Sequence, residues 1–444
     1  MQASYSHLLA VLGTAALLAS VGYQQAQLPS QVDTALLGLV NGVNSIQLPD
    51  GLSLEASQQQ HKQSLFSTSG QLTLTLSASP YQLQYALQYE VQHGIDALFS
   101  GADLSAKLFN VGNTDHDSKT SSSLIVHRQP ALFRGTFKPG RLEITGTIPA
   151  LKGNSSSLLI SSQPATLSFT ASQPGSQQQW GQTHLRLKLP KIQLWEDYSR
   201  AEGITLTELC IDAHQQKADS TLSAAVETRL DKLELKSRTE LVQLSDLQLS
   251  NNIRLQESLN ILWSLHFNRF SSRYIDLHDG HMQLSLNGID GNAVRQLIEI
   301  SQQASQHNWS TARIRSTYAQ QLEAAATQLL TRNPQLTLQV LHASVPASNN
   351  TPEGNINFNA NIQLDHTRLP DNFISQLTDN SLALPQLASA VLATLTVNSH
   401  GPATELARNL IRPVGEPFEQ AIADGHLNFQ LENGIAILDN HPLR

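Results

Sequence analysis

The chain has 444 residues and a formal net charge of −8, and only 14% of its residues are charged. This length allows roughly two or three domains, or one long sheet. No Lys/Arg cluster is present, so nucleic acid is not an expected partner, because neutralising phosphates requires concentrated positive charge. The only cysteine is Cys210, which excludes an intramolecular disulfide and any paired-cysteine site. We expect Cys210, in the strand-like run ITLTELCIDA, to be a buried small apolar residue rather than a reactive thiol.

The N-terminus carries an apolar run, LLAVLGTAALLASVG, over residues 8–22, and residues 1–32 contain no Lys, Arg, Asp or Glu. A helix of this length spans about 22 Å, short of the roughly 30 Å hydrocarbon core of a membrane. Three interpretations stay open: an uncleaved anchor flanked by Tyr5 and Tyr23, a signal peptide cleaved near Ala26, or a buried helix of a cytosolic protein. The first two send the rest of the chain across the inner membrane.

Residues 51–290 alternate apolar and polar side chains with a period of two, which predicts half-buried strands. Gly or Pro marks the turns, at spacings too irregular for a solenoid. In one strand the alternating residues are Tyr81, Leu83, Tyr85, Leu87 and Tyr89. We interpret them as an aromatic ladder on a sheet rather than a ligand-stacking platform. In another strand, Leu185, Leu187 and Leu189 are expected to pack while Arg186 and Lys188 face water.

Residues 279–304 read as strand, turn and helix. Gly288 is expected to break the strand, and Asp290 or Asn292 can cap the helix. The turn Gly-Ile-Asp-Gly lacks the GxGxxG and GxxxxGK[ST] patterns, so we interpret it as a structural turn rather than a phosphate loop. A second helix is expected to start near Ser310 and to end at Asn333.

The C-terminal part returns to strands. The run ASAVLATLTVNS, residues 388–399, predicts a strand, and Pro402 is expected to start a helix. The pair Asn433-Gly434 is a strong hairpin turn signal. Together the elements predict a β-rich α+β fold: a large curled antiparallel sheet, built as a meander, with a few packing helices and an N-terminal hydrophobic helix.

Few side chains suggest chemistry. Asp115, His116 and Asp117 are adjacent in a polar run, which we interpret as a solvated loop rather than a metal site. Sequons occur at Asn154, Asn308 and Asn349, a pattern that is common by chance. No nucleophile elbow, HExxH motif or paired-cysteine site occurs. We therefore predict no catalytic, cofactor-binding or metal-binding residue and no enzyme activity; a hydrolase would need a cleft with converging His and carboxylate groups.

Four short elements resemble the YdgA-like family of bacterial envelope proteins, a domain of unknown function. They are Lys62 with Leu65, Phe66 and Ser67; His93 with Gly94; Ile289 with Asp290 and Gly291; and Asn433 with Gly434. The chain departs from the family where Ile95 replaces a proline after His-Gly, where Lys62-Gln63 replaces Arg-Gly, and where the basic N-terminus is missing. The resemblance implies an inner-membrane-anchored, single-pass protein with a β-rich periplasmic body, and it implies no catalytic residues.

These inferences divide the chain into five parts: 1–23, a membrane anchor or signal peptide; 24–50, a short helical linker; 51–290, a β-rich region; 291–334, a helical pair; and 335–444, an α+β region that completes the sheet. We expect a non-enzymatic envelope protein that binds other envelope components. The alternative is a lipid-handling groove similar to the AsmA-like group, in which an open apolar sheet face would hold acyl chains. That alternative weakens if residues 292–333 cover the apolar face. No cofactor is expected.

Overall fold

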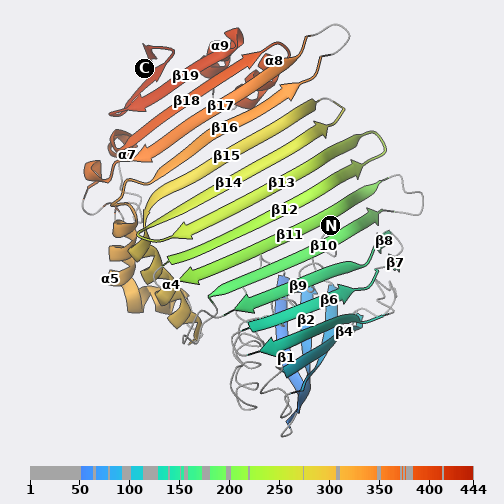
Figure 1. Cartoon of the computed structure of the whole chain (residues 1–444). Helices are drawn as coiled ribbons and strands as arrows, with labels where there is room; N and C mark the ends of the chain where they lie inside the picture. The colour runs from blue at the N-terminus through green and yellow to red at the C-terminus, as the bar shows by residue number, and fades with distance from the viewer. Residues whose placement is uncertain are drawn as a thin grey trace. The chain divides into compact units, whose positions relative to one another are not determined.

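Figure 1 shows the computed structural model of the chain. The structure describes residues 52–63, 67–78, 81–92, 102–113, 129–138, 141–150, 152–154, 159–172, 181–196, 202–218, 221–273, 275–306, 311–347, 352–370, 373, 376, 384–412 and 415–443. The predictions for residues 1–51, including the N-terminal hydrophobic helix and the short linker helix, lie outside these ranges. The predicted fold class is confirmed in its coarser form, since the protein is β-rich with a large antiparallel open sheet and few helices. The chain forms two compact units: residues 1–218 with 230–239, and residues 219–229 with 240–444.

Unit 1 is built from antiparallel strands. They are β1 (Leu52–Gln63), β2 (Ser67–Ala78), β3 (Tyr81–Gln92), β4 (Ala102–Asn113), β5 (Ala131–Lys138), β6 (Arg141–Ile148), β7 (Lys152–Asn154), β8 (Leu159–Ser162), β9 (Ala165–Ser172), β10 (Gln182–Trp195) and β11 (Gly203–Ala218). Neighbours pair in the order β1-β2-β3-β4-β5-β6-β9-β10-β11. The short β7–β8 hairpin joins the sheet through β8 and β10. The residues of β12 (Thr221–Lys236) are divided between the two units.

The core of unit 1 follows the period-two pattern. Tyr85, Leu87 and Tyr89 are all buried, so the described part of the predicted aromatic ladder is core packing rather than a ligand platform. In β10, Leu187 and Leu189 are buried while Arg186 and Lys188 are exposed, which confirms the two faces predicted there. Cys210 differs from expectation, because it is a free thiol that is only half-buried in β11.

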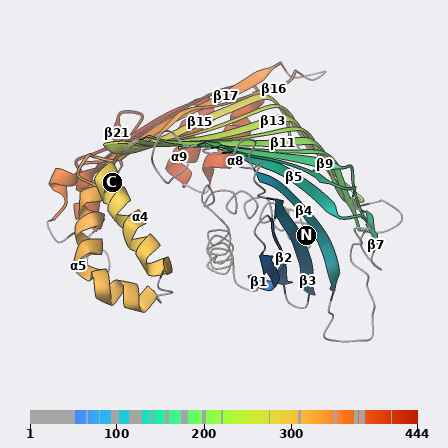
Figure 2. The ribbon, with the colours of Figure 1, turned by 60° about the horizontal axis from the view of Figure 1, so that its bottom comes forward.

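Unit 2 is a second antiparallel meander with helices. Its elements are β13 (Leu241–Leu255), β14 (Ser258–Ser271), β15 (Asp276–Asp290), α4 (Gly291–Gln306), α5 (Thr311–Leu329), β16 (Gln335–Val345), β17 (Gly354–Leu364), η1 (His366–Arg368), α7 (Leu384–Ala390), β18 (Val391–His400), α8 (Ala403–Ile411), α9 (Glu416–Ala421), η3 (Ile422–Asp424), β19 (His426–Glu432), β20 (Ile435–Leu438) and β21 (His441–Pro442). Each strand from β13 to β21 pairs with the next along the chain. Helices α8 and α9 lie against one face of this sheet (Figure 2).

Most element predictions in unit 2 are confirmed, and two are wrong. Helix α4 begins directly after Asp290, and Asn433 and Gly434 form the expected hairpin turn, with φ of 53° and 75°. Gly288 does not break its strand; it takes a φ of 78° within β15, which continues to Asp290. Residues 388–390 belong to helix α7, so the strand predicted over 388–399 begins only at Val391.

Candidate functional site: the two faces of the unit 2 sheet

The strand register of unit 2 aligns apolar side chains into rows. Residues that pair directly across antiparallel strands point to the same face of the sheet. One row runs from β13 to β19: Leu249, Leu265, Met282, Leu341, Phe358, Val397 and Leu427. The next runs through Trp263, Leu284, Leu338, Ala360, Leu395 and Phe429. A third holds Ile253, Ile261, Leu286, Leu336, Ile362, Ala393 and Leu431. We call the face that carries these rows the apolar face.

In the part of the chain that the structure describes, helices cover only part of the apolar face. Ala403, Ala407 and Ile411 of α8 pack with the C-terminal strands, where Val397 and Leu427 are fully buried. Along the first row, the side chains become more exposed toward β13. Leu265 and Met282 are half-buried, and Leu249 is 38% exposed. In the third row, Leu336 and Ile362 are 36% and 46% exposed. Over β13–β16, and at Ile362 of β17, the described part of the apolar face therefore lacks the close cover that α8, α9 and η3 give to the buried residues of β17–β19.

The opposite face carries neutral polar side chains. A row beside the first apolar row consists of Gln248, His266, His281, His342, Asn357, Asn398 and His426. The Nδ1 atoms of His342 and His426 lie 2.7 Å from the amide oxygens of Asn357 and Asn398. Strand β17 presents only amides on this face: Asn355, Asn357, Asn359, Asn361 and Gln363. These amides and imidazoles form the polar face that period-two alternation implies for half-buried strands.

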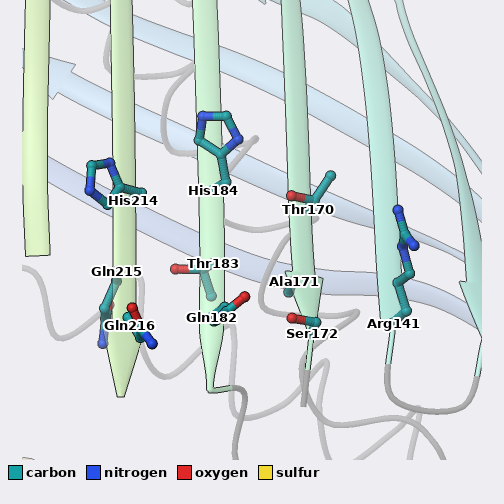
Figure 3. Close-up of a pocket in the computed structure, with 10 residues that line it drawn as sticks. All are labelled: Arg141, Thr170, Ala171, Ser172, Gln182, Thr183, His184, His214, Gln215 and Gln216. Carbon is teal, nitrogen blue, oxygen red and sulfur yellow. The ribbon is translucent and has the colours of Figure 1, made fainter. Parts of the chain in front are cut away.

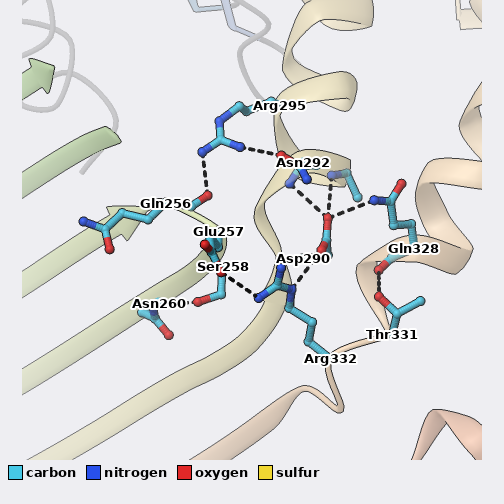
Figure 4. Close-up of polar contacts among 11 residues, drawn as sticks. Gln256, Glu257, Ser258, Asn260, Asp290, Asn292, Arg295, Gln328, Thr331 and Arg332 are labelled. Atoms are coloured by element: carbon cyan, nitrogen blue, oxygen red, sulfur yellow. Dashed lines mark hydrogen bonds and ion pairs between the residues drawn. The ribbon is translucent and has the colours of Figure 1, made fainter. Parts of the chain in front are cut away.

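Helices α4 and α5 are fixed at the end of β15 through Asp290 (Figure 4). One carboxylate oxygen accepts hydrogen bonds from the backbone N–H groups of Asn292 and Ala293, both at 3.0 Å, and from Nε2 of Gln328 at 3.2 Å. The other oxygen accepts from Nε of Arg332 at 2.9 Å. The Asp290 side chain is only 7% exposed. One carboxylate thus caps α4 and binds two side chains near the end of α5, so it joins both helices to the strand.

We call the contacts of Asp290 with α4, Gln328 and Arg332 the Asp290 joint. Further contacts tie this joint to the β13–β14 turn. The N–H of Gly291 donates to the carbonyl of Glu257 at 2.8 Å, and a Cβ on Gly291 would lie 2.2 Å from the carbonyl oxygen of Gln256. Arg295 donates to that same Gln256 carbonyl and to Oδ1 of Asn292. Gly291 is therefore required by close backbone approach, and the predicted structural turn is confirmed. Figure 1 shows α4 and α5 beside the ends of β14 and β15, so they do not extend over β16 and β17.

Acid should weaken this joint. Burial opposes ionisation of Asp290, but the hydrogen bonds from Ala293, Arg332 and Asn292 outweigh it and hold the pKa of the carboxyl below its usual range. A lowered folded-state pKa stabilises the fold above the usual Asp pKa of about 4, and this stabilisation is lost as pH falls through the folded value. We expect the stability difference between the wild type and Asp290→Asn, measured by urea unfolding from pH 7 to pH 3, to shrink below about pH 4. A pH-independent difference would contradict this assignment.

Other sequence features are not brought together. Asp115, His116, Asp117, Asn308 and Asn349 lie outside the described residues, while Asn154 ends the short strand β7. Among the residues that the structure describes, no group of three or more His, Cys, Asp or Glu could hold a metal ion. Within the same ranges no helix has the length and apolar character needed to cross a membrane. The rows of the two faces were not predicted, because they depend on register.

The comparison with protein families matches residues 132–412 to DUF945, described as a bacterial protein of unknown function. The chain belongs to the DUF945 family. The matched region starts in β5 and ends just after α8, so it includes the Asp290 joint and most of the apolar face. No curated protein and no solved structure matches the chain significantly.

Proposed function

We propose that this DUF945 protein is a non-enzymatic envelope protein that binds the acyl chains of an envelope lipid on the apolar face of unit 2. The observation that carries the proposal is the incomplete cover of that face. Leu249, Leu336 and Ile362 are all more than a third exposed, while Val397 and Leu427 in the same sheet are fully buried. Soluble proteins rarely expose contiguous apolar patches, and those that they do expose often bind partners or ligands.

The chemistry of the open part favours an acyl chain. Over β13–β16 the rows contribute aliphatic side chains, one thioether from Met282 and one indole from Trp263, and no charged group; Asn251, which pairs with Trp263, adds one amide. An acyl chain offers only apolar surface, so its burial against these side chains is favourable without any paired polar group. Met282 can adapt its shape to ligands of different outline. Helices α4 and α5, whose cover over the sheet would favour a closed core, are fixed beside the ends of β14 and β15.

The cellular setting belongs to the same proposal. The YdgA-like resemblance and the apolar run at residues 8–22 support an inner-membrane anchor with the β-rich body in the periplasm. In that compartment a lipid ligand is within reach. Another envelope protein seated on the same face is the competing occupant.

The test is native mass spectrometry of the protein purified gently from its own cells, together with phospholipid extraction. We expect bound phospholipid, reduced about tenfold or more in Leu265→Glu, because a charged group on the apolar face would have to be desolvated. The matched control is His266→Glu, its neighbour in β14 on the opposite face, which should keep the lipid. Urea unfolding of both variants checks that they fold.

Three outcomes would contradict the proposal. One is a protein that carries no lipid, and another is equal lipid loss in both glutamate variants. The third is lipid that binds only after residues 1–51 are removed, since that segment would then occupy the face in the full-length chain. In the first of these cases, a stoichiometric protein partner in place of lipid would show that the competing occupant binds this face.

A further inference from the structure

Unit 1 contains a separate cavity of about 400 Å³ at one end of β6, β9, β10 and β11 (Figure 3). Two rows of paired residues line it. Arg141, Ser172, Gln182 and Gln216 form the outer row, and Thr170, His184 and His214 form the inner one. The volume falls in the range of small-molecule sites, about 300–1,000 Å³. Both rows lie on the face of these strands opposite Leu185 and Leu187, while Ala171, Thr183 and Gln215, which alternate with the rows, complete the lining at the strand ends.

The charges at this cavity are already paired. The guanidinium of Arg141 lies 2.5 Å from a carboxylate oxygen of Glu143. Asp212 faces Nε2 of His184 at 2.7 Å and Nε of Arg186 at 3.7 Å. Arg141 and Arg186 therefore each lie beside a carboxylate. A phosphate or carboxylate ligand would have to compete with a carboxylate already in place, so an anion is not the ligand that this cavity favours.

The remaining lining offers neutral groups that both donate and accept. Gln182 and Gln216 each supply an amide NH₂ and an amide oxygen, and Ser172 and Thr170 supply hydroxyls. A ligand that matches such a lining carries several neutral groups that can donate and accept at once. Hydroxyls do so, and saccharides are the ligands richest in them.

We propose that this cavity binds a short, uncharged saccharide. The proposal goes beyond lipid binding, because it concerns another unit, another surface and another ligand chemistry. The row Arg141–Ser172–Gln182–Gln216 would hold the sugar hydroxyls, with Gln182 central because it pairs with Ser172 on one side and Gln216 on the other. The Arg141–Glu143 ion pair and the 2.7 Å contact of His184 with Asp212 would hold these two lining side chains in place.

The experiment is saturation-transfer NMR and calorimetry on the full chain with maltose and N,N′-diacetylchitobiose, using inorganic phosphate and glucuronate as charged probes. We expect at least one neutral disaccharide to bind and the charged probes not to bind. Gln182→Leu should weaken binding about tenfold, through loss of hydrogen bonds and an unmatched sugar hydroxyl. The matched control is Gln193→Leu, further along β10 and outside the cavity, which should change the affinity less than twofold.

The proposal is overturned if neither disaccharide binds at concentrations up to about 10 mM, roughly the weakest affinity that is useful for a small ligand. It is also overturned if phosphate or glucuronate binds instead, or if Gln193→Leu weakens binding as much as Gln182→Leu. Leu265→Glu separates this site from the lipid proposal. That variant should keep saccharide binding whether or not the lipid is lost.

Discussion

Replacing Asp290 with alanine is expected to lower the free energy of unfolding by about 2–4 kcal/mol, the cost of a lost helix N-cap together with a lost charge-assisted hydrogen bond. The carboxylate is nearly buried and accepts hydrogen bonds from two backbone N–H groups, Gln328 and Arg332. Alanine would leave the first turn of α4 uncapped and Arg332 with only Glu257, whose carboxylate lies 3.6 Å away and is 90% exposed. Urea unfolding followed by circular dichroism measures the change.

Glu257→Ala is the matched control for this variant, because it removes the other carboxylate beside the same arginine. An ion pair this exposed contributes little, and we expect a change of less than about 1 kcal/mol. If Glu257→Ala costs as much as Asp290→Ala, the joint does not depend on Asp290. Loss of helical signal before loss of strand signal in Asp290→Ala would show that α4 and α5 detach first.

The sequence around this joint shows where local reasoning succeeds. The order of strand, turn and helix over residues 279–304, and the capping role of Asp290, depend on neighbouring residues and are confirmed. Gln328 and Arg332 lie about forty positions further along, and no local pattern assigns them to the same carboxylate. The prediction that Gly288 ends its strand is wrong, because a glycine can also occur inside a strand where the backbone needs a positive φ. The positive φ of Gly288 lets β15 turn past the Arg332 carbonyl instead of ending the strand.

The two faces of unit 2 show a second limit. Alternation along β17 makes its row of amides visible in the sequence NINFNANIQ. The partner of each amide depends on register, which irregularities near His278, Leu284 and Leu341 shift by single residues. Without that register, His266, His281 and His342 are three scattered histidines rather than neighbours on one face. The same holds for the apolar rows, so the extent of the open apolar surface was not predictable.

Phe133→Ala is expected to have the largest effect on unit 1, a loss of about 3–5 kcal/mol in the free energy of unfolding. The ring is 1% exposed in the core of this unit. It pairs across β5 and β6 with Gly146, where a Cβ would lie 2.4 Å from the ring. The phenyl group therefore fills the space that a side chain at position 146 would take. Its removal leaves a cavity over a glycine, which has no side chain with which to fill it.

A double-variant cycle tests this packing. Gly146→Ala alone should destabilise the wild type because the methyl group meets the ring, whereas in the Phe133→Ala background it should be neutral or stabilising because the space is empty. Leu132→Ala is the control next to Phe133; its side chain is 45% exposed on the other face, so the loss should stay near or below about 1 kcal/mol. Additive effects of Phe133→Ala and Gly146→Ala would contradict the ring-over-glycine contact. A non-additive cycle would show that this pair, rather than the strand alternation alone, fixes how β5 and β6 pack.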